Sequence, residues 1–556
     1  MRLFLLPGRL KTLSRLINAT ALIALFFLPL SQTALAQTDP GYSNHEQRSQ
    51  RLQKLAQSPQ ITLSSVGKSA ADRDLWLLQF GSGEPTAKPA LLVVAGVDGA
   101  HPAGTELALQ MAEQLATRLN ESEFQDLLAT KTLFFLPAAS PDALEQITRN
   151  IKTVTRGNDK PQDDDRDGNR DEDMVEDLNG DGWITWMRIQ DATGEYIAST
   201  EDPRLMVKAD PAKGENGQYR LVQEGRDNDQ DGQFNEDKRG GVNIDRNFAF
   251  DYPIFADQSG DYAASETETR AVMDLLYMHP NIYAVLTFGP ANNLTNPPSY
   301  NASAANQRVV KGVLEQDAAV HKTVSDLYKE LISTSKEAPK LAQSGGNFSQ
   351  TAYFHGGRFS LITPGWWATP DSSWAKDADM DEEKLAQWAS ENDVEIFAEW
   401  QSVNHPDFPD QQVEVGGIQP FAAFNPPVSF LATSATEHLA FITKVAENMP
   451  AVSHQNVRQE SLGNGVHRIT VALLNEGQLP TNTELGNRIR WNQKLITEIS
   501  LSGGQQLLSG RKVQLQDALG AGASVEYSWL VSGRGEVSVE TKSATIATQT
   551  SRFNLR

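Results

Sequence analysis

Residues 90–106 read Ala90-Leu-Leu-Val-Val-Ala95-Gly-Val-Asp98-Gly-Ala-His101-Pro-Ala-Gly104-Thr-Glu106. The apolar run 90–95 predicts a strand that is buried on both faces. A helical pattern follows from Thr105 to Leu119, so we expect Asp98 and His101 in the loop at the end of the strand. A strand, a loop and a helix in this order are the unit from which α/β folds are built.

The same alternation of strand-like and helical patterns extends from Tyr42 to about Met449. Further strand-like runs cover residues 75–80, 132–136, 284–288 and 359–362. Ser265-Glu-Thr-Glu268 has the pattern of a capping box, which predicts a helix from there to about Met278. We therefore expect an α/β domain over residues 37–449.

After Pro450 the pattern changes to short strands separated by Gly, Asn and Ser turns, with no helical period. These strand-like runs cover residues 466–473, 495–501, 524–530 and 536–540. Residues 450–556 therefore predict an antiparallel β-sandwich.

Residues 1–36 have the pattern of a secretory signal peptide. Four basic residues precede or open an apolar stretch that runs from Leu16 to Leu30, and Ala34-Leu-Ala36 matches a cleavage site. A membrane anchor is the alternative, but the apolar run is short for a membrane span. The sequence has no cysteine, so neither a lipidated cysteine nor a disulfide is expected. The expected location is the periplasm or the outside of the cell, with no membrane insertion after cleavage.

The chain is strongly acidic, with 49 Lys and Arg against 71 Asp and Glu and a formal net charge of −22. The leader holds four of the cations and no acid, so 45 against 71 leaves −26 after cleavage. Such a charge repels nucleic acid and anionic membrane surfaces, and it attracts cations instead.

Three copies of the pattern D-x-[DN]-x-D-G lie in an acidic tract at residues 159–240, which we interpret as an insertion. Alternate oxygen-bearing side chains followed by glycine let a loop wrap its oxygens around a hard cation. None of the copies has the Glu that closes an EF-hand, because Met174, Arg188 and Lys238 stand at the twelfth positions. Calcium binding is expected, with a solvated acidic loop as the alternative. The expected ligands are Asp163, Asp165, Asp167, Asp171, Asp177, Asn179, Asp181, Asp227, Asp229, Asp231 and Asn235.

Several segments together resemble the zinc carboxypeptidases of the carboxypeptidase A type. Pro102-Ala-Gly104 follows the position of that family's H-x-x-E metal-binding segment, and Ser140-Pro-Asp-Ala143 resembles its Asn-Pro-Asp-Gly turn. Gly241-Val-Asn-Ile-Asp-Arg-Asn-Phe248 is similar to the family's G-V-D-L-N-R-N-F segment, and bacterial members carry acidic tracts between these two motifs. The resemblance covers residues 42–428. It implies a mixed β-sheet flanked by helices and a cleft that binds a peptide or protein terminus.

The resemblance also implies a site in which two histidines and a glutamate hold zinc and a second glutamate serves as the base. Here the first two ligand positions are Asp98 and His101, both of which are able to bind zinc. The third ligand position is Gly289, which has no side chain, and the position of the base is Pro364. The tyrosine that caps the substrate is matched most nearly by Leu341. A hydrogen-bonded pair of Asp98 and His101 is the alternative to a zinc remnant.

More of the family's substrate-binding residues than of its zinc ligands are present in this sequence. They are Arg156 at the oxyanion position, with Arg149 as the other candidate, and Arg246 with Asn247. The family's carboxylate-binding asparagine is Asp245 here, which is expected to pair with Arg246 and weaken its hold on a ligand carboxylate. Each arginine also has a structural interpretation as an ion-pair residue.

Three functions stay open. The leading hypothesis is a catalytically degenerate exported protein whose cleft binds a peptide without hydrolysing it. Trp366 and Trp367 are candidates for the wall of that cleft or for the core. The main alternative is an active metallocarboxypeptidase with an atypical zinc site, completed by His355, Asn292 or Asn293, although a missing base typically costs about 10²–10⁴ in rate. The third is a calcium-dependent surface or scaffold protein.

Overall fold

The computed structural model describes residues 41–153, 155–161, 175–228, 232, 234, 241–341, 343–369, 375–376, 379–420 and 422–556. The predicted signal peptide lies outside these residues. So do seven of the predicted calcium ligands, namely Asp163, Asp165, Asp167, Asp171, Asp229, Asp231 and Asn235.

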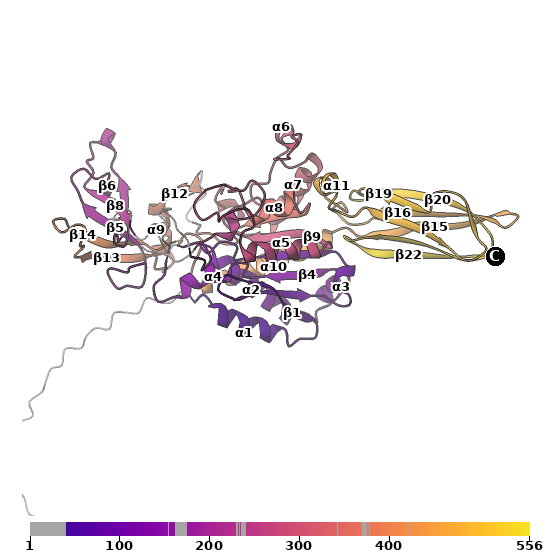
Figure 1. The fold of residues 1–556 in the computed structure, drawn as a ribbon, viewed down its shortest axis with the longest axis horizontal. Helices are drawn as coiled ribbons and strands as arrows, with labels where there is room; N and C mark the ends of the chain where they lie inside the picture. The colour runs from indigo at the N-terminus through magenta and orange to yellow at the C-terminus, as the bar shows by residue number, and fades with distance from the viewer. Residues whose placement is uncertain are drawn as a thin grey trace, which may run out of the picture. The chain divides into compact units, whose positions relative to one another are not determined.

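A six-stranded mixed sheet in the order β1-β2-β4-β3-β9-β10 forms the centre of the α/β part (Figure 1). Strand β3 pairs in parallel with β4 and β9, and β9 pairs in parallel with β10. Strand β2 is antiparallel to β1 and β4. The expected mixed sheet is confirmed. Its strands are β1 (Ile61–Lys68), β2 (Asp74–Phe80), β3 (Ala90–Val94), β4 (Thr132–Leu136), β9 (Ile282–Phe288) and β10 (Phe359–Thr363).

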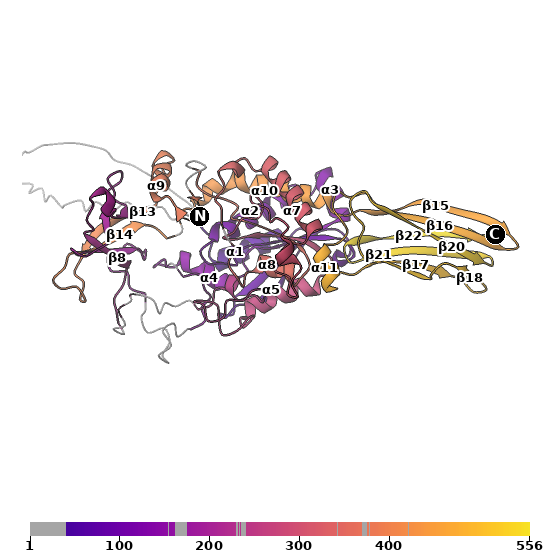
Figure 2. The same ribbon diagram turned by 90° about the horizontal axis from the view of Figure 1, so that it is seen from above.

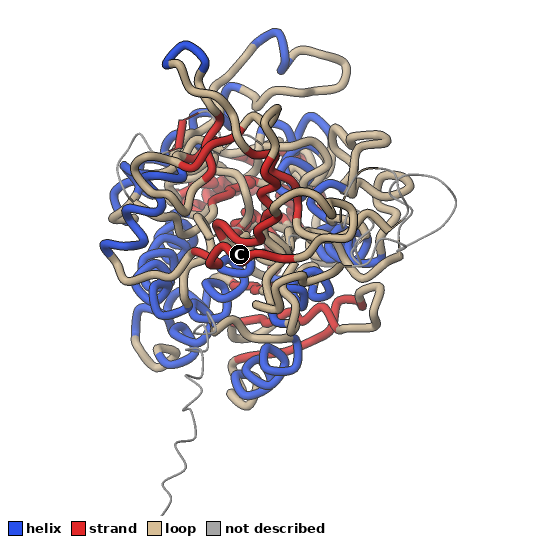
Figure 3. Tube along the Cα trace, turned by 90° about the vertical axis from the view of Figure 1, so that its left-hand side faces the viewer, coloured by secondary structure: helices blue, strands red, loops and turns tan. Residues whose placement is uncertain are grey.

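Helices cover both faces of this sheet because its inner strands are apolar on both sides. Leu91 and Val93 of β3 belong to a core shared with α2 (Pro102–Thr117), α7 (Glu315–Leu331) and α10 (Leu431–Asn448). The alternate residues Leu92 and Val94 pack in a second core with α5 (Thr267–Met278) and α8 (Phe348–Phe354). This alternation is what a two-sided strand requires. Figures 2 and 3 show the helices on the outside of the strands.

The remaining helices of the described α/β part are shorter or lie nearer the surface. They are α1 (His45–Leu55), α3 (Ser122–Thr130), α4 (Pro141–Glu145), α6 (Ala302–Ala305) and α9 (Glu382–Glu391). A two-stranded ribbon joins β11 (Ala375–Lys376) to β12 (Asp379–Met380). None of the described helices combines the length and the apolar composition that crossing a bilayer requires.

The described part of the acidic insertion builds a second, antiparallel sheet, in the order β13-β14-β5-β8-β6-β7. Two of its strands come from much later in the chain, and Val413 pairs with Ile189 across the junction. Met187, Ile189, Val413 and Val415 form its buried core. The strands are β5 (Trp186–Gln190), β6 (Tyr196–Ala198), β7 (Met206–Lys208), β8 (Tyr219–Gln223), β13 (Phe397–Val403) and β14 (Val413–Ile418). Composition alone did not predict this sheet, because its pairing joins segments some 200 residues apart.

The C-terminal part consists of two four-stranded antiparallel sheets, which confirms the predicted β-sandwich. Their orders are β15-β16-β20-β18 and β19-β17-β21-β22. Trp529, Ile499 and Val539 are among the residues that fill the space between them. The strands are β15 (Val452–Gly463), β16 (Val466–Asn475), β17 (Leu495–Leu501), β18 (Gln506–Ser509), β19 (Val513–Gln516), β20 (Ser524–Ser532), β21 (Gly535–Ser543) and β22 (Ile546–Leu555).

One short helix, α11 (Glu484–Ile489), interrupts the sandwich, so the expectation of no helix there is wrong. Its first turn is held by Asp317 of α7, which is 1% exposed. The carboxylate of Asp317 accepts hydrogen bonds from the backbone N–H of Glu484 at 2.8 Å and of Leu485 at 3.0 Å, and from the hydroxyl of Tyr353 at 2.8 Å. Free N–H groups at a helix start require such acceptors, and here the acceptor lies far away in sequence.

We expect Asp317→Ala to lower the free energy of unfolding by about 3 kcal/mol, because it leaves buried donors without an acceptor. Asp326→Ala is the matched control on the same helix, where the exposed carboxylate forms only an ion pair with Lys322. The control should change the free energy by no more than about 0.5 kcal/mol. Urea unfolding measures both, and equal losses in the two variants would contradict the assigned role of Asp317.

Candidate functional site

The loop after β3 carries Asp98, which is 2% exposed. Its Oδ1 accepts a hydrogen bond from the backbone N–H of Ala100 at 2.8 Å, and its Oδ2 accepts one from Asn243 Nδ2 at 3.0 Å. The guanidinium of Arg156 approaches the same oxygen at 3.5 Å. This carboxylate is therefore held by two neutral donors and one cation from within the chain.

His101 precedes the first turn of α2 and is 3% exposed. Its Nε2 lies 2.8 Å from the carbonyl oxygen of Pro364. A carbonyl can only accept, so Nε2 carries the proton. Burial lowers the pKa of His101, although the bond to Pro364 and the charge of Asp98 act in the opposite direction. The imidazole is therefore neutral at pH 7, and its bonded nitrogen has no lone pair to offer a metal.

The predicted alternative, a hydrogen-bonded pair of Asp98 and His101, is present through the backbone and not through the side chains. The two residues are joined by their backbones, with the N–H of His101 donating to the carbonyl of Asp98 at 3.1 Å. Their side chains point to different partners, Asn243 for the one and Pro364 for the other.

A buried network holds the turn at Pro364 in place. The Nδ1 of His438 faces the carbonyl of Ser434 at 2.7 Å, so its Nε2 accepts from the hydroxyl of Tyr328 at 3.1 Å. The oxygen of Tyr328 then accepts from Thr363 Oγ1 at 2.9 Å, and that atom accepts from the N–H of Gly365 at 3.1 Å. Burial lowers the pKa of His438 to about 4, so the chain of bonds stays neutral.

Asp245 occupies the interior beside this loop. Its Oδ1 accepts from the backbone N–H of Phe348 at 3.0 Å. Burial raises its pKa to about 8, and the nearby carboxylate of Asp98 adds to the effect. Asp245 is therefore largely protonated at pH 7. The structure records no ion pair between Asp245 and Arg246, both of which it describes, so the predicted pairing is wrong.

Arg246 ends a 3₁₀ turn, Ile244–Arg246, and is half-buried. Its Nε is buried and has no hydrogen-bond partner. Asn247 is different, because its Nδ2 lies within 3.0 Å of the carbonyls of Ser259 and Tyr262 and of Ser265 Oγ. Asn247 thus shapes the following loop, whereas the side chain of Arg246 forms no ion pair with any described acidic residue.

The bonds of Asn247 also explain why the predicted capping box does not form. Ser265 Oγ is engaged by Asn247 and donates to Glu266 Oε1 at 2.7 Å. Helix α5 begins at Thr267 without a side-chain cap.

The two arginine candidates for the oxyanion position have separate roles. Arg149 forms an ion pair with Asp159 at 2.8 Å and donates to Gln146, which fits its structural interpretation. The side chain of Arg156 is 44% exposed and faces Asp98. Only Arg156 therefore belongs to the region of Asp98 and His101.

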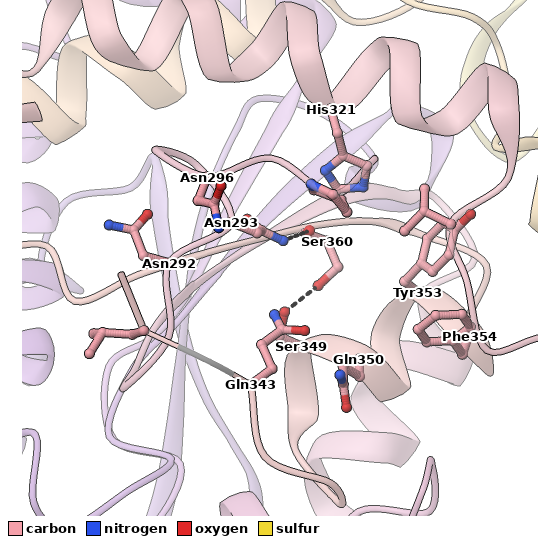
Figure 4. Close-up of a pocket in the computed structure, with 13 residues that line it drawn as sticks. Asn292, Asn293, Asn296, His321, Gln343, Ser349, Gln350, Tyr353, Phe354 and Ser360 are labelled. Carbon is pink, nitrogen blue, oxygen red and sulfur yellow. Dashed lines mark hydrogen bonds between the residues drawn. The ribbon is translucent and has the colours of Figure 1, made fainter. Parts of the chain in front are cut away.

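A cavity of about 380 Å³ lies beside the edge strand β10 and is lined by residues of α7, α8 and β10 (Figure 4). Sequence reasoning pointed to three of its lining residues, Asn292, Asn293 and Leu341, and missed the others because no motif contains them. The lining consists of Asn292, Asn293, Asn296, Pro298, Val313, His321, Leu341, Gln343, Ser349, Gln350, Tyr353, Phe354 and Ser360.

The other residues that the sequence suggested for the site pack against aromatic side chains or in the core. His355 packs edge-on against Phe250, with ring centroids 5.8 Å apart. Trp367 is 2% exposed in the core, and Trp366 packs against Trp388. Of the two interpretations of this tryptophan pair, core packing is the one observed.

Residues 49–361, more than half of the chain, match the family model described as zinc carboxypeptidase. The chain belongs to the zinc carboxypeptidase family. Carboxypeptidase E of Caenorhabditis elegans is 31% identical over 136 residues, which are 22% of this chain and 29% of that protein. Carboxypeptidase D of Rattus norvegicus is 30% identical over 123 residues, 21% of this chain and 9% of that protein. The matches therefore span less than a third of either relative.

Solved structures similar to this chain include thrombin activatable fibrinolysis inhibitor, at 12% identity and a TM-score of 0.40, with 74% of this chain and 75% of that chain covered. Another is carboxypeptidase A of Helicoverpa armigera, at 16% identity and a TM-score of 0.35, covering 65% and 75%. Residues 451–554 match a separate family model, described as a domain of unknown function.

The family's zinc does not fit the residues that stand at its site. His101 has Nδ1 as its one possible metal-binding atom, because Nε2 is bonded to Pro364, while Gly289 has no side chain and Pro364 has no side-chain donor. Across the described ranges, no three His, Asp or Glu side chains come together as a group able to hold a metal. Tetrahedral zinc sites need three protein ligands and an open position for catalysis.

Nothing in the backbone requires glycine at position 289. The left-handed conformation is not used there, and an added Cβ would lie 3.5 Å from side-chain atoms of Ile362 and Val97, an ordinary contact. Gly104 differs, since a Cβ there would lie 2.7 Å from the Cβ of Phe288 and 3.0 Å from the ring of His101. Close approach of α2 to β9 therefore accounts for Gly104, and no such reason accounts for Gly289.

The described acidic loop, Asp177 to Ile184, is closed by its own hydrogen bonds. The carboxylate of Asp177 accepts from the N–H groups of Gly180 and Gly182, and Asp181 accepts from that of Trp183. Glu224, which no motif contains, accepts from Leu178 and Thr185 across the loop, and burial raises its pKa to about 7. Asp227 similarly accepts from Gly232. Calcium binding by these loops stays a prediction.

We expect Gly289→Ala to raise the free energy of unfolding by about 0.4–1 kcal/mol, because it removes flexibility from the unfolded chain without a clash. Gly104→Ala is the matched control and should lower the free energy by about 1–3 kcal/mol through overpacking. Urea denaturation measures both variants. Destabilisation by Gly289→Ala would show that the backbone does need glycine there.

Calcium at about fifty times its dissociation constant should stabilise the protein by about 2 kcal/mol. Asp177→Ala removes the acceptor that organises the described loop and should reduce this gain, whereas the exposed Asp126→Ala on α3 should leave it unchanged. Thermal melting with calcium and with a chelator measures the difference. Identical melting temperatures in both conditions would contradict calcium binding by this insertion.

Proposed function

We propose that the cleft of this zinc carboxypeptidase relative binds the C-terminal carboxylate of a peptide or protein without hydrolysing the peptide bond. The observation that carries the proposal is that the half-buried Arg246 forms no ion pair with any described acidic residue. A guanidinium binds a carboxylate through two parallel hydrogen bonds, and such charge-assisted bonds are about twice as strong as neutral ones. The described residues provide no acidic partner for Arg246, so a ligand carboxylate would supply one.

The neighbouring Asp245 supports this use of Arg246. The family's pattern has asparagine at this position, and an aspartate anion would repel a ligand carboxylate. Because the pKa of Asp245 is raised to about 8, the residue is a neutral acid at pH 7 and resembles asparagine in charge. The positive charge of Arg246 is then not cancelled by the residue beside it.

The proposal excludes hydrolysis because the resemblance places no carboxylate at the position of the general base. The position of the general base is Pro364, whose carbonyl is bonded to His101. A missing base typically costs about 10²–10⁴ in rate. An active metallocarboxypeptidase with an atypical site is the rival, and it requires Nδ1 of His101 to bind a metal while Nε2 stays bonded to Pro364.

Export belongs to the same proposal. A leader over residues 1–36, with the mature protein in the periplasm or outside the cell, would place the cleft where peptide termini of the envelope or of other exported proteins are available. The sandwich of residues 450–556 would then be a separate contact module, and the third hypothesis, a calcium-dependent scaffold, assigns the main role to it.

Binding should require the free carboxylate. An N-acetylated peptide with a free C terminus is expected to bind, and the same peptide with a C-terminal amide to bind at least about tenfold more weakly. Arg246→Gln should cause a similar loss for the acid form, whereas the exposed Arg308→Gln should not. Isothermal titration calorimetry with a small library of C-terminal residues measures these affinities. Equal affinity for acid and amide would contradict the proposal.

Binding of the acid peptide should weaken as the pH rises from 7 to 9. The pKa of Asp245 is raised to about 8, so the residue is neutral below that pH and becomes an anion above it. Asp245→Asn should remove this pH dependence and keep the bond to the N–H of Phe348. An unchanged pH profile in Asp245→Asn would show that another group is responsible.

Hydrolysis separates the proposal from its main rival. Purified protein incubated with zinc and a peptide library should release no C-terminal residue above the uncatalysed background, as followed by mass spectrometry. Stoichiometric zinc together with hydrolysis that is lost in His101→Ala would establish the metallopeptidase instead.

A further inference from the structure

The two sides of the C-terminal sandwich differ in how their edge strands are covered. On one side the edge strands β15 and β22 contact each other. His454 Nδ1 lies 2.8 Å from Ser551 Oγ, and Gln459 Nε2 donates to the carbonyl of Asn554 at 3.1 Å. The other side, opposite β15 in Figure 2, ends in β18 and β19, which three residues connect. No hydrogen bond joins β18 to β19, both of which the structure describes in full, so this side is open.

Strand β19 has one free edge of backbone groups. It pairs with β17 alone, and Val513 lies opposite Glu498 in that pairing. The carbonyl of Lys512 accepts from the N–H of Ile499 at 3.0 Å, so the backbone groups of Lys512 face β17. Hydrogen bonding alternates from residue to residue along an antiparallel strand. The N–H and carbonyl groups of Val513 and Leu515 therefore face away from β17, at the free edge.

The side chains at this edge are apolar and exposed. Val513 is 40% exposed and Leu515 is 60% exposed, and Leu508 of β18 is 52% exposed. Edge strands pair readily with other strands, and charged side chains usually protect them. Aliphatic residues with free backbone groups therefore indicate an edge that another strand covers.

The sequence of this edge is complementary to itself. Alternate positions from 511 to 517 hold a cation, two aliphatic residues and an anion, namely Arg511, Val513, Leu515 and Asp517. When two copies pair antiparallel about Gln514, Val513 of each copy lies opposite Leu515 of the other. Arg511 then lies opposite Asp517 of the other copy. Aliphatic pairs and opposite charges directly across from each other stabilise antiparallel strands, and a twofold contact requires such self-complementarity.

Charge complementarity also selects the register. Only residues whose backbone groups face the free edge can exchange hydrogen bonds with a second copy, which allows a centre at Val513, Gln514 or Leu515. A centre at Val513 puts Arg511 opposite Leu515, and a centre at Leu515 puts Val513 opposite Asp517. The centre at Gln514 is the one of the three that pairs charge with charge and aliphatic with aliphatic.

The charges at both ends of the edge are available for this contact. Arg511 is exposed and forms no ion pair with a described acidic residue. The side chain of Asp517 is 67% exposed and pairs with Lys494, whose side chain is 52% exposed. Exposed pairs contribute little to stability, so Asp517 is free to accept a second cation. Lys512 is paired with Glu498 at 3.3 Å within its own sheet.

The net charge of the sandwich also favours a contact between copies here. Residues 450–556 contain 11 Lys and Arg against 8 Asp and Glu, which leaves +3 in a chain with a formal net charge of −22. The negative charge therefore lies in the α/β part, through which two copies repel each other. Of the two parts, the sandwich is the one whose charge does not oppose self-association.

We propose that the chain forms a homodimer in which the β19 strands of two copies pair antiparallel about Gln514. The pairing joins two four-stranded sheets into one sheet across a twofold axis. It satisfies the free backbone groups of Val513 and Leu515 in both copies and covers part of their side chains. Because the contact is short, the expected dissociation constant is about 10–100 µM. The dimer does not depend on peptide binding at Arg246.

Charge reversal tests the pairing and its register together. Arg511→Asp puts two acids opposite each other and should weaken dimerisation at least about tenfold, and Asp517→Arg should do the same with two cations. The double variant restores opposite charges and should dimerise as wild type does. Analytical ultracentrifugation of the purified protein from about 1 to 200 µM measures the dissociation constants.

Two further variants separate this edge from other surfaces. Leu515→Lys places a charge in the apolar part of the contact and should leave the protein monomeric. Val457→Lys on β15 is the matched control, since Val457 is 44% exposed, and it should dimerise normally. The sequence has no cysteine, so Gln514→Cys introduces a single thiol. Facing Cα atoms of a pair that is not hydrogen-bonded lie about 4.5 Å apart, which a disulfide bridges. Mild oxidation should therefore cross-link Gln514→Cys and leave Val457→Cys largely monomeric.

The proposal is overturned if wild type stays monomeric at about 200 µM, if Leu515→Lys dimerises as wild type does, or if the double charge variant does not regain dimerisation. Equal cross-linking of Gln514→Cys and Val457→Cys would also overturn it. Arg246→Gln should dimerise normally, so failure of the dimer is distinguishable from failure of peptide binding.

Discussion

The hydrogen bond from His101 Nε2 to the carbonyl of Pro364 connects the loop after β3 with the loop after β10. These loops end parallel strands that are separated by β9, so the bond spans the carboxyl edge of the sheet. Both groups are buried, and breaking the bond would leave a donor and an acceptor that each cost about 1–3 kcal/mol. The proton on Nε2 of His101 and the contact between the loop after β3 and the turn at Pro364 depend on this bond, whereas burial is what lowers the pKa of His101.

Two parts of the interior differ in whether their buried polar groups have hydrogen-bond partners. Behind Pro364, the hydrogen bonds from His438 through Tyr328 to Thr363 give every polar group in the row a partner. On the side of α8, Asn292, His321 and Gln350 keep polar atoms without partners. A satisfied network fixes a loop, whereas buried atoms without partners lower stability.

A buried carboxylate is costly unless its charge is compensated or removed. Three buried aspartates show three different arrangements. Asp142 is paired with Arg73 at 2.6 Å. Asp317 is satisfied by backbone N–H groups and a tyrosine hydroxyl. Asp245 has one N–H donor and instead retains its proton, with its pKa raised to about 8. Asp245 titrates near neutral pH, as Glu224 in the acidic insertion does, and Asp245 is next to Arg246 in the sequence.

The sequence by itself determined the central strands, the two-part organisation into an α/β region and a β-sandwich, and the family. Apolar runs of five to seven residues report burial directly, and short motifs such as Pro102-Ala-Gly104 record local backbone constraints, here the close approach of α2 to β9. The resemblance to the family also predicts that Gly289 and Pro364 occupy the positions of a zinc ligand and of the base.

Only the tertiary structure determined which buried groups are hydrogen-bonded to each other. Asp98 and His101 were predicted as a pair, yet their side chains are bonded to Asn243 and Pro364, which are distant in sequence. The second sheet, the neutral state of Asp245 and the cavity lined by His321 and Gln350 had no sequence signal either. Hydrogen-bond partners, pKa shifts and cavities arise from contacts between segments hundreds of residues apart, and no local pattern encodes them.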